Sequence, residues 1–161
     1  MSTSPDGEPV VIAIGNRWRG DDAAGPLVAD RLNTGALGCR IVEGRMDALG
    51  LINAWDGAPL AIIIDAANTG AAPGTVHYLD GADAVRRRGI GRCSSHGSGL
   101  AEALALGEVL QRVPSRLRVF AIELGGVRDG APPTPAVAAA ITTVAHQVTD
   151  ALQERACTKP H

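Results

Sequence analysis

Residues 10–14 and residues 60–64 form two continuously apolar segments rich in Val and Ile, each five residues long. Unbroken apolar runs of this length are typical of strands buried on both faces, as in a parallel sheet that helices cover. Shorter or more polar runs predict three further strands, at 39–42, 75–79 and 117–124. The 75–79 run is rich in polar residues, so we expect that strand near an edge of the sheet.

Between these runs, apolar residues recur at helical spacing. The pattern predicts helices over residues 24–32, 46–55, 82–88, 100–110 and 136–152. In the second of these helices, the spacing places Leu49 and Ile52 on the inward face. Pro26 is tolerated only in the first turn of a helix, which fixes the start of the first one. Thr134 is expected to cap the last helix, with Pro135 in its first turn.

Strands that alternate with helices indicate an α/β fold. We expect a three-layer sandwich, in which a mostly parallel, twisted sheet of about five strands carries helices on both faces. At 161 residues, the chain has the size of one domain, which we assign to residues 10–153. Residues 1–9 are expected to form a flexible tail and residues 154–161 a polar tail.

The composition restricts the classes of partner. The chain has 17 acidic and 15 basic residues, so its net charge of −2 would attract neither nucleic acid nor an anionic membrane. No apolar run approaches the roughly 20 residues that a membrane-spanning helix needs, so we expect no membrane insertion. The polar start of the chain is unlike a signal peptide, and its three cysteines lack paired spacing. We therefore expect a cytoplasmic location.

The loop after the first strand resembles two phosphate-binding motifs without matching either. Its glycines stand at positions 15, 20 and 25, whereas a dinucleotide-binding loop needs Gly-x-Gly-x-x-Gly. A P-loop would continue after Gly20 with Lys and Ser or Thr, but Asp21 and Asp22 stand there. Two carboxylates at the start of a helix would repel a phosphate. The sequence therefore argues against phosphate binding.

Asp21, Asp22 and Asp65 all come shortly after predicted buried strands. Because the carboxyl ends of parallel strands meet at one edge of a sheet, we expect these acids at the same edge, where ligands bind in open α/β sheets. Each acid also has a structural interpretation. One acid of the pair could cap the following helix, and Asp65 could cap the turn after its strand.

His96 lies in a loop rich in Ser and Gly, just before the helix predicted at 100–110. Taken alone, it is compatible with an exposed or locally hydrogen-bonded residue. Together with two carboxylates, an imidazole would form a metal site with open positions, suited to a divalent transition metal such as zinc or nickel. His77, His146 and His161 have no comparable neighbours in the sequence.

The sequence favours activated water over a protein nucleophile for any hydrolytic reaction. Neither Ser94 nor Ser95 stands in a nucleophile elbow. A metal ion or a carboxylate could instead activate a water molecule.

These residues together resemble the [NiFe]-hydrogenase maturation endopeptidases. The family's opening pattern is Gly-Asn-x4-Asp-(Asp/Glu)-x-x-Gly after a buried strand. It stands here as Gly15-Asn16, Asp21-Asp22 and Gly25. The family's strand-end acid matches Asp65, its histidine matches His96, and its late Pro-Thr-Pro matches residues 133–135. The likeness runs over residues 10–152.

The resemblance implies an activity and a set of roles. It implies a hydrolase: an endopeptidase of aspartic type, with carboxylate or metal assistance, that removes a C-terminal peptide from a [NiFe]-hydrogenase large-subunit precursor after nickel insertion. It assigns catalysis and metal contact to Asp22, Asp65 and His96. It assigns a supporting role to Gly15, Asn16, Asp21 and Gly25.

The resemblance also implies where the metal comes from. The nickel would be supplied by the precursor, and the resting enzyme could be metal-free, with zinc or cadmium able to occupy the site. The alternative is a non-enzymatic, nickel-sensing chaperone or docking protein for the same precursor, which would use the same ligands without cutting.

The chain departs from the family after the second strand. The family has a segment like Asp-Gly-Gly-Thr there, and this chain has residues 43–47, which bring in larger side chains. Glu43, Arg45 and Asp47 are therefore candidates for contact with the substrate. Trp18 in the first loop is a further candidate, and its alternative is a partly buried anchor of that loop.

Overall fold

The computed structural model describes residues 7–88 and 99–157. Its sheet has five strands in the order β2-β1-β3-β5-β4. The strands are β1 (Val10–Ile14), β2 (Arg40–Gly44), β3 (Ala61–Ala67), β4 (Val76–Asp80) and β5 (Leu117–Glu123). All neighbours are parallel except β4, which pairs with β5 in the antiparallel direction. The predicted mostly parallel sheet is confirmed, and β4 lies at an edge as its polar pattern indicated.

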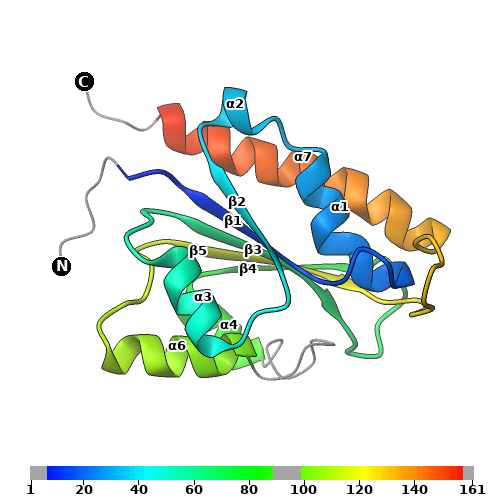
Figure 1. Ribbon diagram of the computed structural model, residues 1–161, viewed down its shortest axis with the longest axis horizontal. Helices are drawn as coiled ribbons and strands as arrows, with labels where there is room; N and C mark the ends of the chain where they lie inside the picture. Colours follow the sequence, from blue (N-terminus) through cyan, green and yellow to red (C-terminus); the bar gives the residue numbers. More distant parts are fainter. Residues whose placement is uncertain (1–6, 89–98, 158–161) are drawn as a thin grey trace.

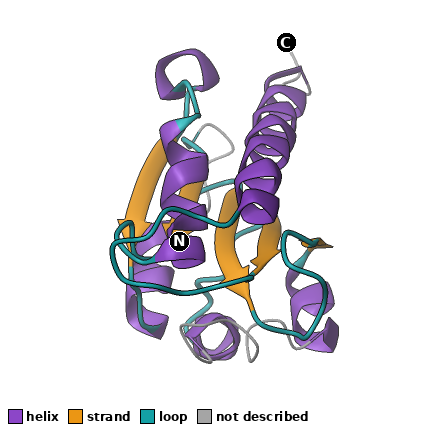
Figure 2. Ribbon diagram, turned by 90° about the vertical axis from the view of Figure 1, so that its right-hand side faces the viewer, coloured by secondary structure: helices purple, strands orange, loops and turns teal. Residues whose placement is uncertain are grey.

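Helices cover both faces of this sheet, which confirms the predicted three-layer fold (Figures 1 and 2). One face carries α1 (Ala24–Asp30), α2 (Thr34–Leu37) and the long α7 (Pro135–Cys157). The other carries α3 (Ala48–Trp55), α4 (Ala82–Arg88) and α6 (Gly99–Val109). None of the helices in the described part of the chain is long and apolar enough to cross a membrane.

The core is divided by the sheet into two apolar layers. Every residue of β1 and β3 is buried, as their unbroken apolar runs predicted. Ile62 and Ile64 pack in the layer of α1 and α7, whereas Ile63 packs in the layer of α3 and α6. Since side chains alternate along a strand, Asp65 belongs to the same sheet face as Ile63, the face that α6 covers.

Three details of the predicted elements were wrong. The strand β3 does not stop at Asp65 but continues to Ala67, because Ala67 still pairs with Glu123 of β5. The last helix runs to Cys157, past the predicted end at residue 152. In α3, Leu49 is 56% exposed and Leu51 is in the core at 1%, because the buried face of this helix runs through Leu51, Ile52 and Trp55.

Candidate functional site

The loop between β1 and α1 brings two acids to the carboxyl edge of the sheet. A 3₁₀ turn, η1 (Gly20–Ala23), contains both Asp21 and Asp22. Their exposed fractions are 0% and 1%. The turn packs against β3, whose strand neighbours β1 directly. The acids of this turn therefore lie near the end of the strand that carries Asp65.

Two glycines allow the loop to fold this tightly. Gly15 has a φ of +152°, and a Cβ at this position would lie 2.2 Å from the carbonyl oxygen of Asp22. At Gly25, a Cβ would lie 2.5 Å from the carbonyl oxygen of Ile14 and 3.0 Å from that of Ile64. The first turn of α1 therefore lies directly against the ends of β1 and β3, where a side chain has no room.

Asp21 joins this loop to the segment between β5 and α7. Its carboxylate accepts hydrogen bonds from the backbone N–H groups of Gly125 and Gly126, each at 2.7 Å, and of Thr134 at 2.6 Å. The hydroxyl of Thr134 also donates to it, at 2.9–3.0 Å. A buried carboxylate held by neutral donors at the start of a long helix is also favoured by the helix dipole. Asp21 thus connects residues more than one hundred positions apart in the sequence.

The other end of the loop is held by Asn16 and Arg17. The side chain of Asn16 accepts a hydrogen bond from the backbone N–H of Trp18 at 3.0 Å. Arg17 forms a fork with Asp30, through two bonds of 2.7 Å, and also pairs with Glu43. The hydrogen bonds from Arg17 lower the pKa of Asp30 below its usual range. These contacts fasten the loop to α1 and to β2.

Asp65 is 93% buried within β3, opposite Ala121 of β5. Its Oδ1 accepts a hydrogen bond from the backbone N–H of Ala66 at 2.7 Å. The sheet face that carries Asp65 is the one covered by α6, and α6 begins at Gly99. His96 lies outside the described residues, three positions before this helix. Within the described part of the chain, no group of three His, Cys, Asp or Glu side chains is arranged to hold a metal ion.

Glu123 was missed by sequence reasoning, although it ends β5 at the same edge of the sheet. It is 1% exposed and accepts hydrogen bonds from the backbone N–H groups of Thr69 and Gly70, at 2.7 and 3.0 Å. The Thr69 hydroxyl and the Nε2 of His77 lie 2.9 and 3.1 Å from its Oε2. Burial would raise the pKa of Glu123, but these hydrogen bonds hold it below its ordinary value. His77, which had no suitable neighbours in the sequence, is therefore paired with Glu123.

The proposed substrate contacts have different surroundings. Trp18 is 77% exposed, so it is not the partly buried anchor that was its alternative interpretation. Glu43 forms a salt bridge with Arg17, whereas Arg45 is exposed. Asp47 caps α3 by accepting a hydrogen bond from the backbone N–H of Gly50 at 2.8 Å, which explains this acid structurally.

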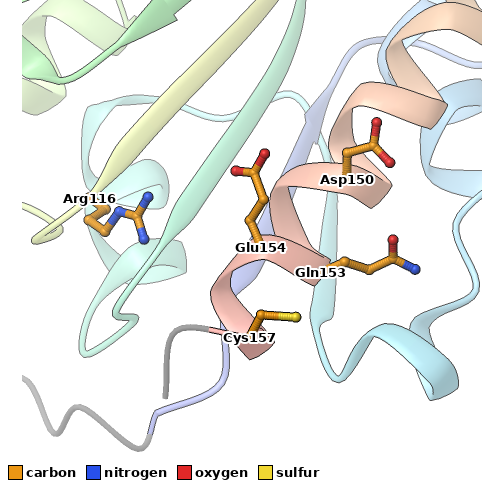
Figure 3. A pocket seen from close by; sticks show the side chains of 5 residues that line it. All are labelled: Arg116, Asp150, Gln153, Glu154 and Cys157. Atoms are coloured by element: carbon orange, nitrogen blue, oxygen red, sulfur yellow. The ribbon is translucent and has the colours of Figure 1, made fainter. Parts of the chain in front are cut away.

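A separate hollow lies at the opposite end of the molecule. Arg116, just before β5, and Cys157, at the end of α7, line it together with residues on the last turns of that helix (Figure 3). These residues are at the amino end of the parallel strands, away from Asp22 and Asp65. The lining side chains include two acids, Asp150 and Glu154, and one base, Arg116. This hollow contains none of the candidate site residues.

The sequence and the fold place the chain in a family of known proteins. Residues 31–151 match the hydrogenase maturation protease family, and the chain belongs to that family. The matched segment contains Asp65 and His96, whereas Asp21 and Asp22 precede it.

Solved structures of the same class share the fold. The hydrogenase maturating endopeptidase HybD from E. coli is similar, with a TM-score of 0.77, 24% identity and coverage of 92% of this chain and 93% of that one. The [NiFe] hydrogenase maturation protease HybD from Thermococcus kodakarensis has a TM-score of 0.70 and 22% identity, covering 91% and 99% of the two chains.

Curated relatives are hydrogenase expression/formation proteins. HupD of Bradyrhizobium diazoefficiens is 26% identical over 140 residues, which cover 84% of this chain and 73% of that protein. HupM of Azotobacter chroococcum is 26% identical over 123 residues, which cover 74% of this chain but only 59% of that protein.

Proposed function

We propose that the protein is an endopeptidase that removes a C-terminal peptide from a [NiFe]-hydrogenase large-subunit precursor after nickel insertion. The observation that carries this proposal is the burial of Asp22 and Asp65 near the ends of adjacent parallel strands, in a chain of the hydrogenase maturation protease family. Names of relatives that refer to hydrogenase expression and formation support a hydrogenase as the target.

In the proposed reaction, nickel belongs to the substrate. Asp22, Asp65 and His96 contact the nickel of the loaded precursor, and the resting enzyme is metal-free, although zinc or cadmium can take the same ligands. Carboxylates and an imidazole suit such a borderline metal. Contact with the metal would place the precursor's cleavage site at the carboxyl edge of the sheet, so that only a loaded precursor is bound productively.

Hydrolysis then follows from these carboxylates. A carboxylate at the site accepts a proton from water, whose oxygen attacks the carbonyl carbon of the scissile peptide bond. The C–N bond breaks, and the same proton passes to the leaving amine. The products are the mature large subunit and a free C-terminal peptide.

The test is the intact mass of the precursor after incubation with the protein. We expect loss of a C-terminal peptide from nickel-loaded precursor only, and no loss with Asp22→Asn, provided that this variant keeps its folded circular dichroism spectrum. Asp150→Asn is the matched control, since Asp150 lies on α7 beside the distant hollow, and it should cut normally.

The other outcomes each have a meaning. Cleavage of nickel-free precursor would remove nickel as the signal. Normal cleavage by Asp22→Asn would rule out the role given to Asp22. Binding of the loaded precursor without any mass loss would favour the chaperone.

A further inference from the structure

The first loop presents an aromatic side chain to solvent beside the candidate site. Trp18 is 77% exposed and stands four residues before Asp22. The chain has only two tryptophans. The other, Trp55, is 1% exposed and donates a hydrogen bond from its Nε1 to the carbonyl oxygen of Arg112. Tryptophan side chains are on average highly buried in folded proteins, so the exposure of Trp18 is unusual.

The backbone around Trp18 is held in place. The carbonyl oxygen of Trp18 accepts a hydrogen bond from the N–H of Gly130, and the N–H of Trp18 donates to the side chain of Asn16. The backbone of Arg19 forms an isolated antiparallel β-bridge with that of Asp129, and the N–H of Gly20 donates to the carbonyl oxygen of Ala131.

Residues 16–20 and 125–131, which we call the Trp18 platform, thus form one hydrogen-bonded unit. A held backbone loses little conformational entropy when a partner covers it.

Two of the cations on the platform, Arg17 and Arg19, are paired with carboxylates of the protein itself. Arg17 binds Asp30 and Glu43, and Arg19 lies 3.3 Å from Asp129. The platform also carries Val127, which is 36% exposed. Since these guanidinium groups already have carboxylate partners, apolar contact by Trp18 is the stronger source of binding free energy at this surface.

We propose that Trp18 is the aromatic anchor through which this protein docks on an apolar recess of its folded protein substrate. The proposal rests on the proposed function, because the substrate is the large-subunit precursor. Exposed tryptophans held on ordered loops are frequent centres of binding energy in protein interfaces. Because Trp18 and Asp22 share one short, fastened loop, docking at Trp18 would also orient the precursor's C-terminal segment toward the carboxyl edge of the sheet.

Steady-state cleavage of the precursor tests this role. Trp18→Ala should raise KM by about tenfold or more, with kcat changed less than about twofold, because the anchor acts in binding and not in chemistry. Trp18→Phe should recover part of the loss. Val109→Ala is the matched control: Val109 is 79% exposed at the end of α6, away from the platform, and its KM should match the wild type. KM should depend little on ionic strength.

A direct readout of contact uses 5-fluorotryptophan in the intact protein. The fluorine spectrum should contain two resonances, and Trp18→Phe assigns them. Titration with unlabelled precursor should shift or broaden the Trp18 resonance and remove its solvent isotope shift, while Trp55 stays unchanged.

An unmoved Trp18 resonance at saturating precursor, or an unchanged KM for Trp18→Ala, would overturn the proposal. Wild-type protein that binds precursor through Trp18 but never cuts it would instead contradict the proposed function and leave the docking surface standing.

Discussion

At the scale of single residues, buried carboxylates hold together the loops that frame the site. Glu123 accepts hydrogen bonds from Thr69 and Gly70, in the turn after β3, and also contacts His77 on β4. Asp21 plays the equivalent part for the segment before α7. Each acid is nearly inaccessible to solvent, so hydrogen bonds rather than hydration stabilise its carboxylate.

The charge of Glu123 should make the protein acid-sensitive. Its folded-state pKa lies below the ordinary value of 4.5, so its contribution to stability is present above that pH and is lost as the pH falls through the depressed pKa. Glu123→Gln should lower the free energy of unfolding at pH 7 by about 1–3 kcal/mol, and the difference from wild type should shrink below pH 4.5.

Urea unfolding at stepped pH values measures this difference. His77→Gln should be measured in parallel, because it removes the imidazole that lies 3.1 Å from Glu123 and leaves the carboxylate. A difference between Glu123→Gln and wild type that stays constant down to pH 3 would show that the Glu123 charge is not the cause.

The sequence predicted that an acid pair follows the first strand, but not how its two members differ. The backbone donors at residues 125, 126 and 134 explain why Asp21 is buried. These donors are more than one hundred residues away in the sequence, so no local pattern predicts them. Glu123 had a weak signal: an acid that ends an otherwise apolar strand. That signal was identical in kind to the one used for Asp65, and only the tertiary structure shows the pairing of Glu123 with His77.

At the scale of elements, the site depends on how closely α1 approaches the two central strands. Gly25 lies at this contact, where the carbonyl oxygens of residues 14 and 64 occupy the space that a Cβ would need. The helix start is set by Pro26 and the preceding turn, as the sequence indicated. The position of η1 beside β3 therefore requires glycine at position 25 as well as at position 15.

Gly25→Ala should separate α1 from the strand ends and destabilise the protein by about 3 kcal/mol or more, since backbone atoms cannot yield to the added methyl group. Gly35→Ala is the matched control, because its Cβ would meet nothing closer than 3.7 Å. Thermal and urea unfolding of both variants measure the effect. Equal stability of the two variants would mean that the helix can move away without cost.

Element prediction succeeded where burial on both faces leaves an unbroken apolar run, as in β1 and β3. It failed where pairing or packing extends an element past its sequence signal. The end of β3 is set by its ladder to β5. The last turns of α7 are polar in sequence but are held by tertiary contacts, including Glu154 with Arg118 and Arg155 with the carbonyl of Gly7.

At the scale of the whole molecule, the candidate chemistry is concentrated at one end of the sheet. Asp21, Asp22, Asp65 and the Trp18 platform all lie at the carboxyl ends of the parallel strands. The amino end carries the hollow beside α7 (Figure 3) and the ion pair of Arg118 and Glu154. Stability is therefore contributed from both ends, whereas we expect the proposed cleavage to depend on one.

Two variants with similar stability costs separate these contributions. Thr134→Val removes a hydroxyl donor of Asp21, and Glu154→Ala removes the carboxylate beside Arg118, whose side chain is 12% exposed. Each should lower the free energy of unfolding by about 1 kcal/mol. Only Thr134→Val should also lower kcat/KM for precursor cleavage, by about tenfold, because it loosens the turn that carries Asp22. Urea unfolding and cleavage kinetics measure the two effects. Equal kinetic losses in both variants would instead mean that activity follows global stability, and that Asp21 does not hold the catalytic loop in position.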